Sequence, residues 1–367
     1  MSTQRIRQLA AAGRLRGMDA IILMPGPNLA YLTGLSLHLS ERVALAIIPT
    51  DGRDLLIVLP GLEQPRAQSE FQAGVPVQWF PWSDDEGPMD ALRRAAGGLI
   101  GRTVGVEFIT MRVLELRAIE EVAGVHAIDA TDALASLRMH KDAAELALMR
   151  EAVRIVETGL RIAIESIRPG RTERQIAAIW EDAMRDEGAE GTSFATIVAS
   201  GPNSANPHHT TGDRAIAAGD LVILDGGALY KGYCSDITRT VAVGHISTSQ
   251  QEMYAAVLAA NAAGIAAAQP GASGASIDRA ARSVIEEAEL GQYFIHRTGH
   301  GLGMEIHEPP YISSANRQPL AVGTVFTVEP GVYVAGLGGV RIEDAVLLTA
   351  SGPETLTTID RALRILK

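Results

Sequence analysis

The sequence predicts a mixed α/β protein of two domains, and three observations support this prediction. The chain has 367 residues, which is more than a single hydrophobic core usually serves. Up to about residue 130, helical and β-rich segments alternate, as in an α/β layer with partly parallel strands. The second half contains a faint internal repeat. We therefore expect one domain over residues 1–131 and another over 132–367, with the boundary in the segment DATDALASLRMHKDAAE.

Composition limits the partners of the chain. Its net charge of −11 disfavours nucleic acid, whose binding depends on clustered Lys and Arg. The longest apolar run near the N-terminus, AIILM, is too short for a signal-peptide core or a membrane span. Cys234 is the single cysteine, which excludes internal disulfides and fits a reducing compartment. We expect a cytoplasmic protein that binds neither nucleic acid nor membranes.

The first half reads as alternating elements closed by Pro or Gly turns. An amphipathic helix is predicted over 4–17, and β-rich runs are predicted over 19–25, 42–50, 53–60 and 103–108. No phosphate-cradling glycine loop follows any of these runs, and no nucleophile has a base at a recognisable offset. We interpret this half as scaffold or interface.

The second half contains the same pattern twice. A helical pattern over Glu145–Ser166 ends in IRPG and is followed by a second helix over 172–188, which Thr172 could cap. A helical pattern over Gln251–Ala268 ends in AQPG and is followed by a helix over 275–291. Each copy leads into a β-rich region. The repeat predicts two similar halves about a pseudo-twofold axis, with a site between them; two unrelated helix pairs are the alternative.

Two acids, Asp225 and Asp236, lie in the hairpin pattern VILDGGALYKGYCSDITRTV. An Asp at a strand end usually forms a turn. Two acids on adjacent strands would repel each other, however, unless a cation sits between them. Cys234, in the same segment, is interpreted as a small buried residue and not as a ligand.

Further metal-binding side chains lie between residues 296 and 343. Three histidines, His296, His300 and His307, occur in HRTGHGLGMEIHEPP. Two strand-like runs follow and deliver Glu329 and Glu343. Imidazole beside carboxylates suits a borderline divalent metal. Four carboxylates and one histidine can hold two ions about 3.5–4 Å apart with a shared water.

Strand parity and loop composition add neighbouring residues. Thr327 shares a face with Glu329 under a period of two. Arg341 shares a face with Glu343 and is expected to orient its carboxylate, a structural salt bridge being the alternative. His208 lies in the turn-rich loop SGPNSANPHHTTGD, a type of segment that often carries function. His209 beside it is expected to face solvent.

These motifs, with YLTG at residue 31, resemble the proline-specific branch of metallopeptidase family M24, which includes Xaa-Pro dipeptidase and aminopeptidase P. The resemblance covers both domains, and the five ligand types occur in family order and spacing. It implies a creatinase-like N-terminal domain over 1–131 and a pita-bread catalytic domain over 132–367. It also implies a homodimer in which the N-terminal domain reaches the partner's site.

The resemblance implies specific roles for these residues. Two divalent ions, Mn²⁺ first and Co²⁺ or Zn²⁺ as alternatives, are bound by five residues, with Asp236 and Glu343 bridging: Asp225, Asp236, His300, Glu329 and Glu343. Four residues match positions used around the substrate: His208, His296, His307 and Arg341. Tyr311 stands where related dipeptidases often place an arginine, and we assign it to the substrate site; Arg317 is the next cation.

The expected reaction is hydrolysis of an Xaa-Pro imide bond in short peptides. Such a bond lacks the N–H that most peptidases bind, so the site must be shaped for proline. Glu329 is expected to take the proton of the attacking water, His307 to donate to the developing oxyanion, and His208 to position the substrate. We favour Xaa-Pro dipeptidase over aminopeptidase P. A metal-dependent non-peptidase hydrolase or lyase of the same fold is the alternative from another class.

Overall fold

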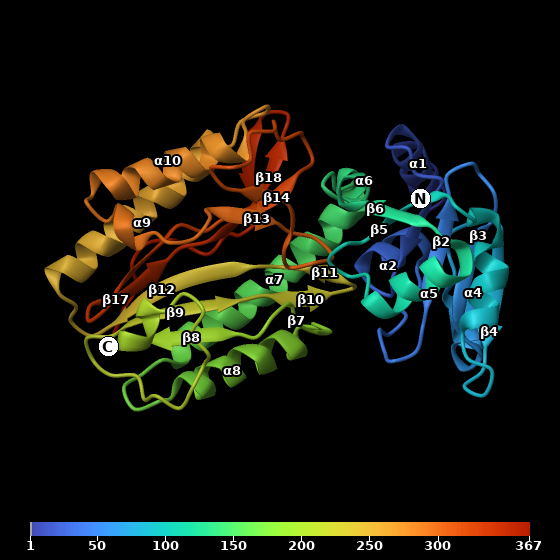
Figure 1. Cartoon of the computed structure of the whole chain (residues 1–367). Coiled ribbons are helices and arrows are strands. Elements are labelled where there is room, and N and C mark those ends of the chain that lie inside the picture. Colours follow the sequence, from blue (N-terminus) through green and yellow to red (C-terminus); the bar gives the residue numbers. More distant parts are fainter. Residues whose placement is uncertain (1) are drawn as a thin grey trace. The chain divides into compact units, whose positions relative to one another are not determined.

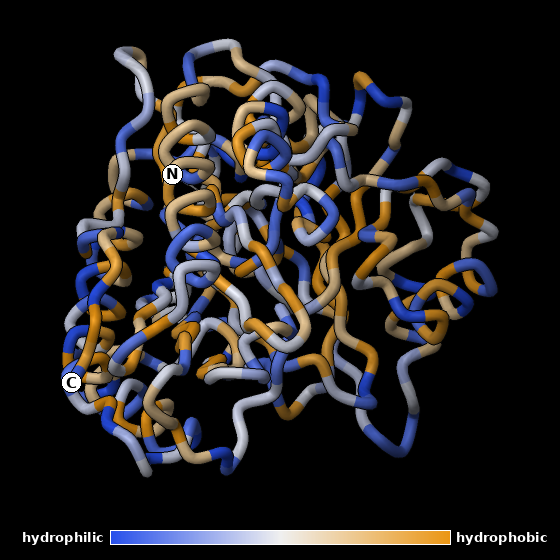
Figure 2. The backbone as a smooth tube through the Cα atoms, turned by 90° about the vertical axis from the view of Figure 1, so that its left-hand side faces the viewer, coloured by the Kyte–Doolittle hydropathy of each residue, from blue (hydrophilic) through white to orange (hydrophobic). Residues whose placement is uncertain are grey.

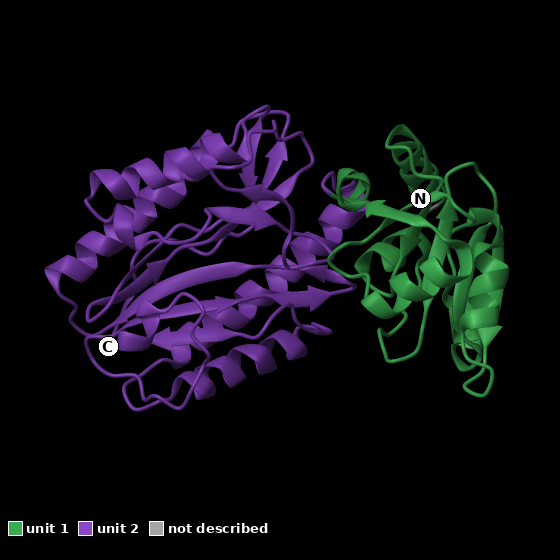
Figure 3. Cartoon of the chain, in the orientation of Figure 1, with its two compact units in different colours: residues 1–138 green, residues 139–367 purple. Residues whose placement is uncertain are grey.

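The computed structural model describes residues 2–367 and divides the chain into two compact units, one ending at Arg138 and the other spanning Met139–Lys367 (Figure 3). The division therefore lies seven residues beyond the expected boundary at residue 131 (138 − 131 = 7). Helix α6 (Thr131–Arg138) accounts for this difference, because it contacts α1 (Ser2–Leu15) and stays with the first unit.

The first unit is built on a six-stranded mixed sheet of order β4-β3-β2-β1-β5-β6 (Figure 1). Its central strand β1 pairs antiparallel with β2 and parallel with β5, as the alternating pattern predicted. The strands are β1 (Ala20–Leu23), β2 (Leu45–Pro49), β3 (Leu55–Pro60), β4 (Val77–Trp82), β5 (Thr103–Val106) and β6 (His126–Asp129). The remaining helices are α2 (Pro27–Thr33), η1 (Gly61–Glu63), α3 (Gln64–Glu70), α4 (Met89–Ala96), η2 (Gly97–Leu99) and α5 (Val113–Ala123).

Two helix pairs organise the second unit, as the repeat predicted. They are α7 (Ala143–Ser166) with α8 (Glu173–Asp186), and α9 (Thr248–Ala267) with α10 (Gly274–Glu287). Thr172 caps α8 through a capping box with Gln175, which satisfies backbone N–H groups that a helix start leaves unpaired. Gly159 of α7 lets the buried Trp180 of α8 pack closely, since a Cβ there would lie 2.7 Å from the indole ring. The first pair is therefore held by close packing between its two helices.

Two antiparallel sheets complete the two halves, with orders β20-β12-β9-β8 and β14-β13-β15-β18-β19; only β20 pairs parallel, with β12. Smaller sheets are β11-β10-β7 and β16-β17. The first-half elements are β7 (Gly191–Thr192), β8 (Ile197–Ser200), η3 (Gly201–Ala205), β9 (Leu221–Gly226), β10 (Ala228–Tyr230), β11 (Tyr233–Cys234) and β12 (Ile237–Val243). The second-half elements are η4 (Gly291–Tyr293), β13 (Gly299–Gly301), β14 (Glu308–Ile312), β15 (Val325–Val328), β16 (Gly331–Val334), β17 (Gly338–Arg341), β18 (Asp344–Thr349), β19 (Gly352–Thr355) and β20 (Ile365–Leu366).

Apolar side chains bury the sheets against the helices. Strands such as β2 (LAIIP) and β9 (LVILDG) are buried hydrophobic runs. Many of the outer turns are hydrophilic (Figure 2). One core cluster joins α7 and α8 to β9 and β12, and another joins α9 and α10 to β16 and β17. Over residues 2–367, no helix combines the length and the apolar character needed to cross a membrane. The two halves thus each supply a rigid support for polar side chains.

Candidate active site

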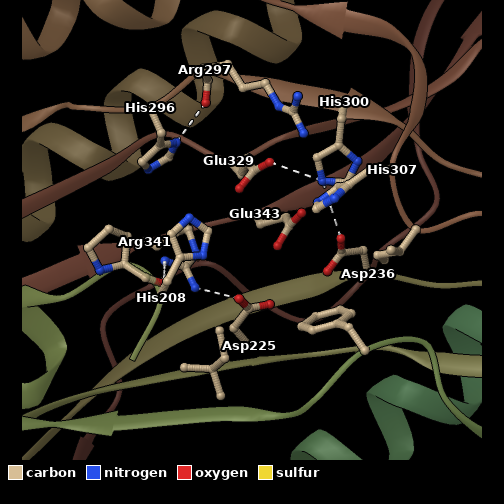
Figure 4. Close-up of a pocket in the computed structure, with 14 residues that line it drawn as sticks. His208, Asp225, Asp236, His296, Arg297, His300, His307, Glu329, Arg341 and Glu343 are labelled. Atoms are coloured by element: carbon tan, nitrogen blue, oxygen red, sulfur yellow. Dashed lines mark hydrogen bonds and ion pairs between the residues drawn. The ribbon is translucent and has the colours of Figure 1, made fainter. Parts of the chain in front are cut away.

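A cavity of about 420 Å³ lies within the second unit and receives side chains from both of its halves (Figure 4). It contains nine of the ten site residues that the sequence predicted. The lining residues are Phe194, Ile197, Pro207, His208, Asp225, Asp236, His296, Arg297, His300, Ile306, His307, Glu329, Arg341 and Glu343.

The hairpin that carries the two aspartates is confirmed. Strands β9 and β12 pair antiparallel, and Asp225 stands opposite Thr238. Asp236 precedes Thr238 by two positions, so both aspartates lie on one face. The connection between the strands is more than a turn, because β10 and β11 pair with each other and β10 pairs with β7. Cys234 is buried there against a hydrophobic cluster, as expected.

The second half brings its three ligand-type residues together by strand pairing. His300 lies on β13, which pairs with β15, and β15 pairs with β18. Glu329 follows β15 and Glu343 precedes β18, so the register that pairs Val328 with Asp344 sets them opposite each other. The Thr327 hydroxyl donates to Glu329 Oε1 at 3.2 Å, which agrees with the predicted shared face.

The chemistry of these side chains fits divalent cations. One potential ligand atom each from Asp236, His300 and Glu343 all lie within 4.8 Å of one another. Within residues 2–367, Asp225 Oδ1, Asp236 Oδ1 and Glu343 Oε1 are buried without a hydrogen-bond partner, which is costly unless a cation satisfies them. His300 Nδ1 lies 3.1 Å from the Gly301 carbonyl. Donation to that carbonyl leaves Nε2 available as a metal ligand.

Burial and mutual repulsion set the charges of the cluster. Burial and the neighbouring Glu343 raise the pKa of Asp236 well above its usual value, and burial and Glu329 do the same for the pKa of Glu343. Burial also raises the pKa of Asp225. Burial opposes ionisation of Glu329, but the hydrogen bond and charge of His300, 3.2 Å away, lower its pKa to about 2. A cation would relieve the repulsion among these carboxylates.

Arg341 contacts a different carboxylate from the one expected. Arg341 Nη2 donates to Asp225 Oδ2 at 2.5 Å. Arg341 reaches Glu343 through Thr238. The Thr238 hydroxyl accepts from Arg341 Nε at 3.2 Å and donates to Glu343 Oε2 at 2.7 Å. Arg341 therefore supports the Glu343 carboxylate indirectly, through Thr238, and forms its direct ion pair with Asp225. Asp225 competes successfully because β9 and β17 lie in contact, a long-range feature that strand parity cannot reveal.

Tyr333 connects Arg341 to His296. Arg341 Nη1 donates to the Tyr333 hydroxyl at 2.8 Å, and that hydroxyl lies 3.0 Å from His296 Nε2. Burial raises the pKa of Tyr333 to about 12, and burial lowers the pKa of His296. Sequence reasoning missed Tyr333, although its position four residues after Glu329 in EPGVY offered a signal.

The remaining predicted substrate residues are all exposed to some degree. His208 and His307 are both exposed at the cavity, and the His307 ring packs edge-on against His300 with centroids 4.2 Å apart. Burial and the charge of His300 lower the pKa of His307 to about 4, so its imidazole is neutral near pH 7. Tyr311 is 37% exposed and does not belong to the cavity lining; its ring lies under the guanidinium of Arg297. Arg297, which does line the cavity, was missed.

His209 does not face solvent as expected. Its Nε2 lies 2.8 Å from Glu173 Oε2, and its side chain is only 16% exposed. Glu173 also accepts hydrogen bonds from Ser200 and Asn203, so this buried carboxylate ties the His208 loop to α8. The sequence places Glu173 far from this loop, and local composition gave no sign of the contact.

Comparison with known proteins relates this geometry to a family. The family model described as "Metallopeptidase family M24" matches residues 147–350, and "Creatinase/Prolidase N-terminal domain" matches residues 5–140. The chain is 35% identical to the Xaa-Pro dipeptidase of Pyrococcus horikoshii over 98% of both proteins.

Solved structures share the whole fold. A recombinant prolidase from Thermococcus sibiricus superposes with a TM-score of 0.93 at 37% identity, over 100% of this chain and 99% of the other. An X-Pro aminopeptidase from Thermotoga maritima superposes with a TM-score of 0.82 at 35% identity, over 97% and 100% of the two chains. The expected fold, a creatinase N-terminal domain followed by a pita-bread domain, is confirmed. The chain belongs to metallopeptidase family M24.

Proposed function

We propose that this metallopeptidase hydrolyses Xaa-Pro dipeptides with the aid of two divalent metal ions. The observation that carries the proposal is the convergence of four acids and one imidazole in one buried site. Three of the acids have an oxygen without a hydrogen-bond partner within residues 2–367. Full-length relatives named Xaa-Pro dipeptidase and prolidase support the choice of substrate.

Five residues would hold the metal ions: Asp225, Asp236, His300, Glu329 and Glu343. We assign the bridging positions to Asp236 and Glu343, whose carboxylates come from different halves. Mn²⁺ is our first choice, with Co²⁺ and Zn²⁺ as alternatives, since ligand type alone does not select among them. Bound ions of this kind polarise a scissile carbonyl and make an attacking water more acidic.

The chain's own residues supply the proton transfers. Glu329 lies in the cavity beside His300, and we assign its carboxylate to accept a proton from the attacking water before passing it to the proline nitrogen. His307 is neutral and keeps one ring N–H, which we assign to the developing oxyanion. We assign His208, exposed at the cavity, to positioning of the substrate.

One side of the site is ordered by a chain of contacts that runs from Arg341 through Tyr333 to His296. Because Arg341 Nη2 and Nη1 are bound to Asp225 and the Tyr333 hydroxyl, the Asp225 carboxylate has a fixed orientation. His296 lines the cavity at the end of this chain of contacts, where it could meet the substrate. We therefore propose that Arg341 acts on the substrate through Asp225 and His296.

Aminopeptidase P activity is the second candidate. It is favoured by the likeness to the X-Pro aminopeptidase of Thermotoga maritima and by Tyr311, which stands where related dipeptidases place a cation. The resemblance of the sequence to the proline-specific branch of family M24 also leads us to propose a homodimer. A cytoplasmic location agrees with a single, buried cysteine.

The test compares hydrolysis of Ala-Pro and Ala-Pro-Ala by the purified chain, before and after chelation and after separate addition of Mn²⁺, Co²⁺ and Zn²⁺. We expect Ala-Pro to be preferred and activity to be lost on chelation. His300→Ala should abolish turnover in every metal. Preference for the tripeptide would select aminopeptidase P, and undiminished turnover after thorough chelation would overturn the metallopeptidase mechanism.

A further inference from the structure

Two arginines, Arg297 and Arg341, line the cavity. The donor groups of Arg341 are already used in hydrogen bonds to neighbouring protein groups. Arg341 uses Nη2 for Asp225, Nη1 for the Tyr333 hydroxyl and the Pro207 carbonyl, and Nε for the Thr238 hydroxyl. It is 4% exposed. Binding a substrate anion would require breaking these contacts, so Arg341 is poorly suited to recognise a carboxylate.

Arg297 is the cavity cation whose polar groups remain available. Within residues 2–367, its guanidinium makes no hydrogen bond and no ion pair. Its carbon Cζ lies 4.5 Å from the centroid of the Tyr311 ring, a cation–π contact that leaves the N–H groups at the rim of the guanidinium free to donate. In Figure 4 the side chain extends toward His300, on the cavity side of the backbone.

The charges around the cavity favour binding of a substrate anion at Arg297. The same cavity carries Asp225, Asp236, Glu329 and Glu343, which would repel a negatively charged group. A substrate with a carboxylate can therefore enter favourably only if that carboxylate points away from the acids and toward Arg297.

We propose that Arg297 binds the C-terminal carboxylate of the Xaa-Pro dipeptide, and that Tyr311 holds its guanidinium in place. This inference rests on the proposed dipeptidase function and specifies how a dipeptide is distinguished from a longer peptide. A guanidinium can bind a carboxylate through two parallel N–H groups, which gives directional recognition. Tyr311 then supports substrate binding without contacting the substrate, which agrees with its position outside the cavity lining. In a tripeptide the proline carbonyl is an amide and carries no charge for Arg297 to pair with.

The experiment compares Ala-Pro with its C-terminal amide, Ala-Pro-NH₂, in the metal-loaded full-length enzyme. Hydrogen bonds to charged groups are strong enough that Arg297→Gln should lower kcat/KM for Ala-Pro by about 10- to 100-fold, mainly through KM. Hydrolysis of the amide should change by less than about twofold, since it offers no anion. Arg297→Lys should retain part of the preference, because it keeps the charge but not the paired donors.

Arg317→Gln is the matched control. Arg317 is exposed, lies in the same part of the sequence and does not line the cavity, so its removal should leave both substrates unaffected. Tyr311→Leu should weaken the preference for Ala-Pro less than Arg297→Gln does, because the guanidinium remains but loses its aromatic support.

Binding of L-proline and L-prolinamide, measured by isothermal titration calorimetry, gives a readout that needs no turnover. Wild-type protein should bind proline more tightly than prolinamide, and Arg297→Gln should remove the difference. The inference is overturned if Arg297→Gln keeps the preference for the free carboxylate, or if both substrates and both ligands lose affinity equally, as for a purely structural side chain. Failure of the dipeptidase proposal looks different, because the wild-type protein would then hydrolyse neither Ala-Pro nor its amide, or would prefer the amide to Ala-Pro.

Discussion

Glu343 and Asp344 are adjacent buried carboxylates with opposite surroundings, and this difference predicts opposite mutational effects. Glu343 Oε2 accepts from Thr238, but Oε1 is buried without a partner within residues 2–367. Asp344 accepts from the side chains of Arg239, Arg361 and Thr357, at distances of 2.7–2.8 Å. Of these two neighbours, Glu343 is therefore the one with a buried carboxylate oxygen that is left for a cation.

Glu343→Gln should raise the free energy of unfolding of the chelated protein. An unsatisfied buried polar atom costs about 1–3 kcal/mol, and the amide keeps the shape, removes the negative charge and adds a donor beside Asp236. With metal the sign should reverse. A ligand present at 100 times its Kd stabilises the folded state by about 2.7 kcal/mol, and the variant should lose most of that gain.

Asp344→Asn is the control for burial. Removing one partner of a buried ion pair costs about 3–5 kcal/mol, so this variant should be less stable in both conditions. Urea denaturation followed by circular dichroism, in excess EDTA and in excess Mn²⁺, measures all four cases. The reasoning is refuted if Glu343→Gln destabilises the chelated protein, since its carboxylate would then have a structural function without metal.

Two further predictions concern the supports of the site. Thr238→Val removes the hydroxyl that joins Arg341 to Glu343. This variant should bind metal about 10- to 100-fold more weakly in a competitive chelator titration. An unchanged affinity would mean that the strands alone orient Glu343. The second prediction concerns Glu173. Burial alone would raise the pKa of Glu173, but hydrogen bonds from Ser200, Asn203 and His209 hold it below its usual value. A lowered folded-state pKa gives stability that is present above the unfolded pKa of about 4.3 and is lost as the pH falls through the folded value. Glu173→Gln should therefore cost about 1.5–3 kcal/mol at pH 7 in urea denaturation and progressively less below pH 4, and a pH-independent loss would contradict this account.

Local patterns predicted those parts of the protein whose signals lie within a few residues. The Thr172 cap, the two helix pairs, the β9–β12 hairpin and the face shared by Thr327 and Glu329 are all encoded by short-range periodicity or turn chemistry. Strand β4 in the first unit escaped prediction because its sequence VQWFPW contains a proline, which strand patterns usually exclude. It tolerates Pro81 as an edge strand.

Local sequence patterns could not predict contacts between segments that lie far apart in the chain. Arg341 and Asp225 are 116 positions apart, and Glu173 and His209 are 36 apart, so no periodicity relates them. Arg297 was missed because related dipeptidases place a cation after the HEPP segment, whereas Arg297 lies before that segment, directly after His296. The pairing of β13 with β14 sets His300 opposite Tyr311, which brings the preceding Arg297 over that ring.

The division of the proposed ligands between two halves has a consequence for how the enzyme matures. Asp225 and Asp236 belong to the first helix pair and its sheet, and His300, Glu329 and Glu343 belong to the second. The complete set of five donors exists only once both halves have folded and docked. Loading of both ions would then act as a proofreading step, because chains with one half misfolded cannot assemble the full site.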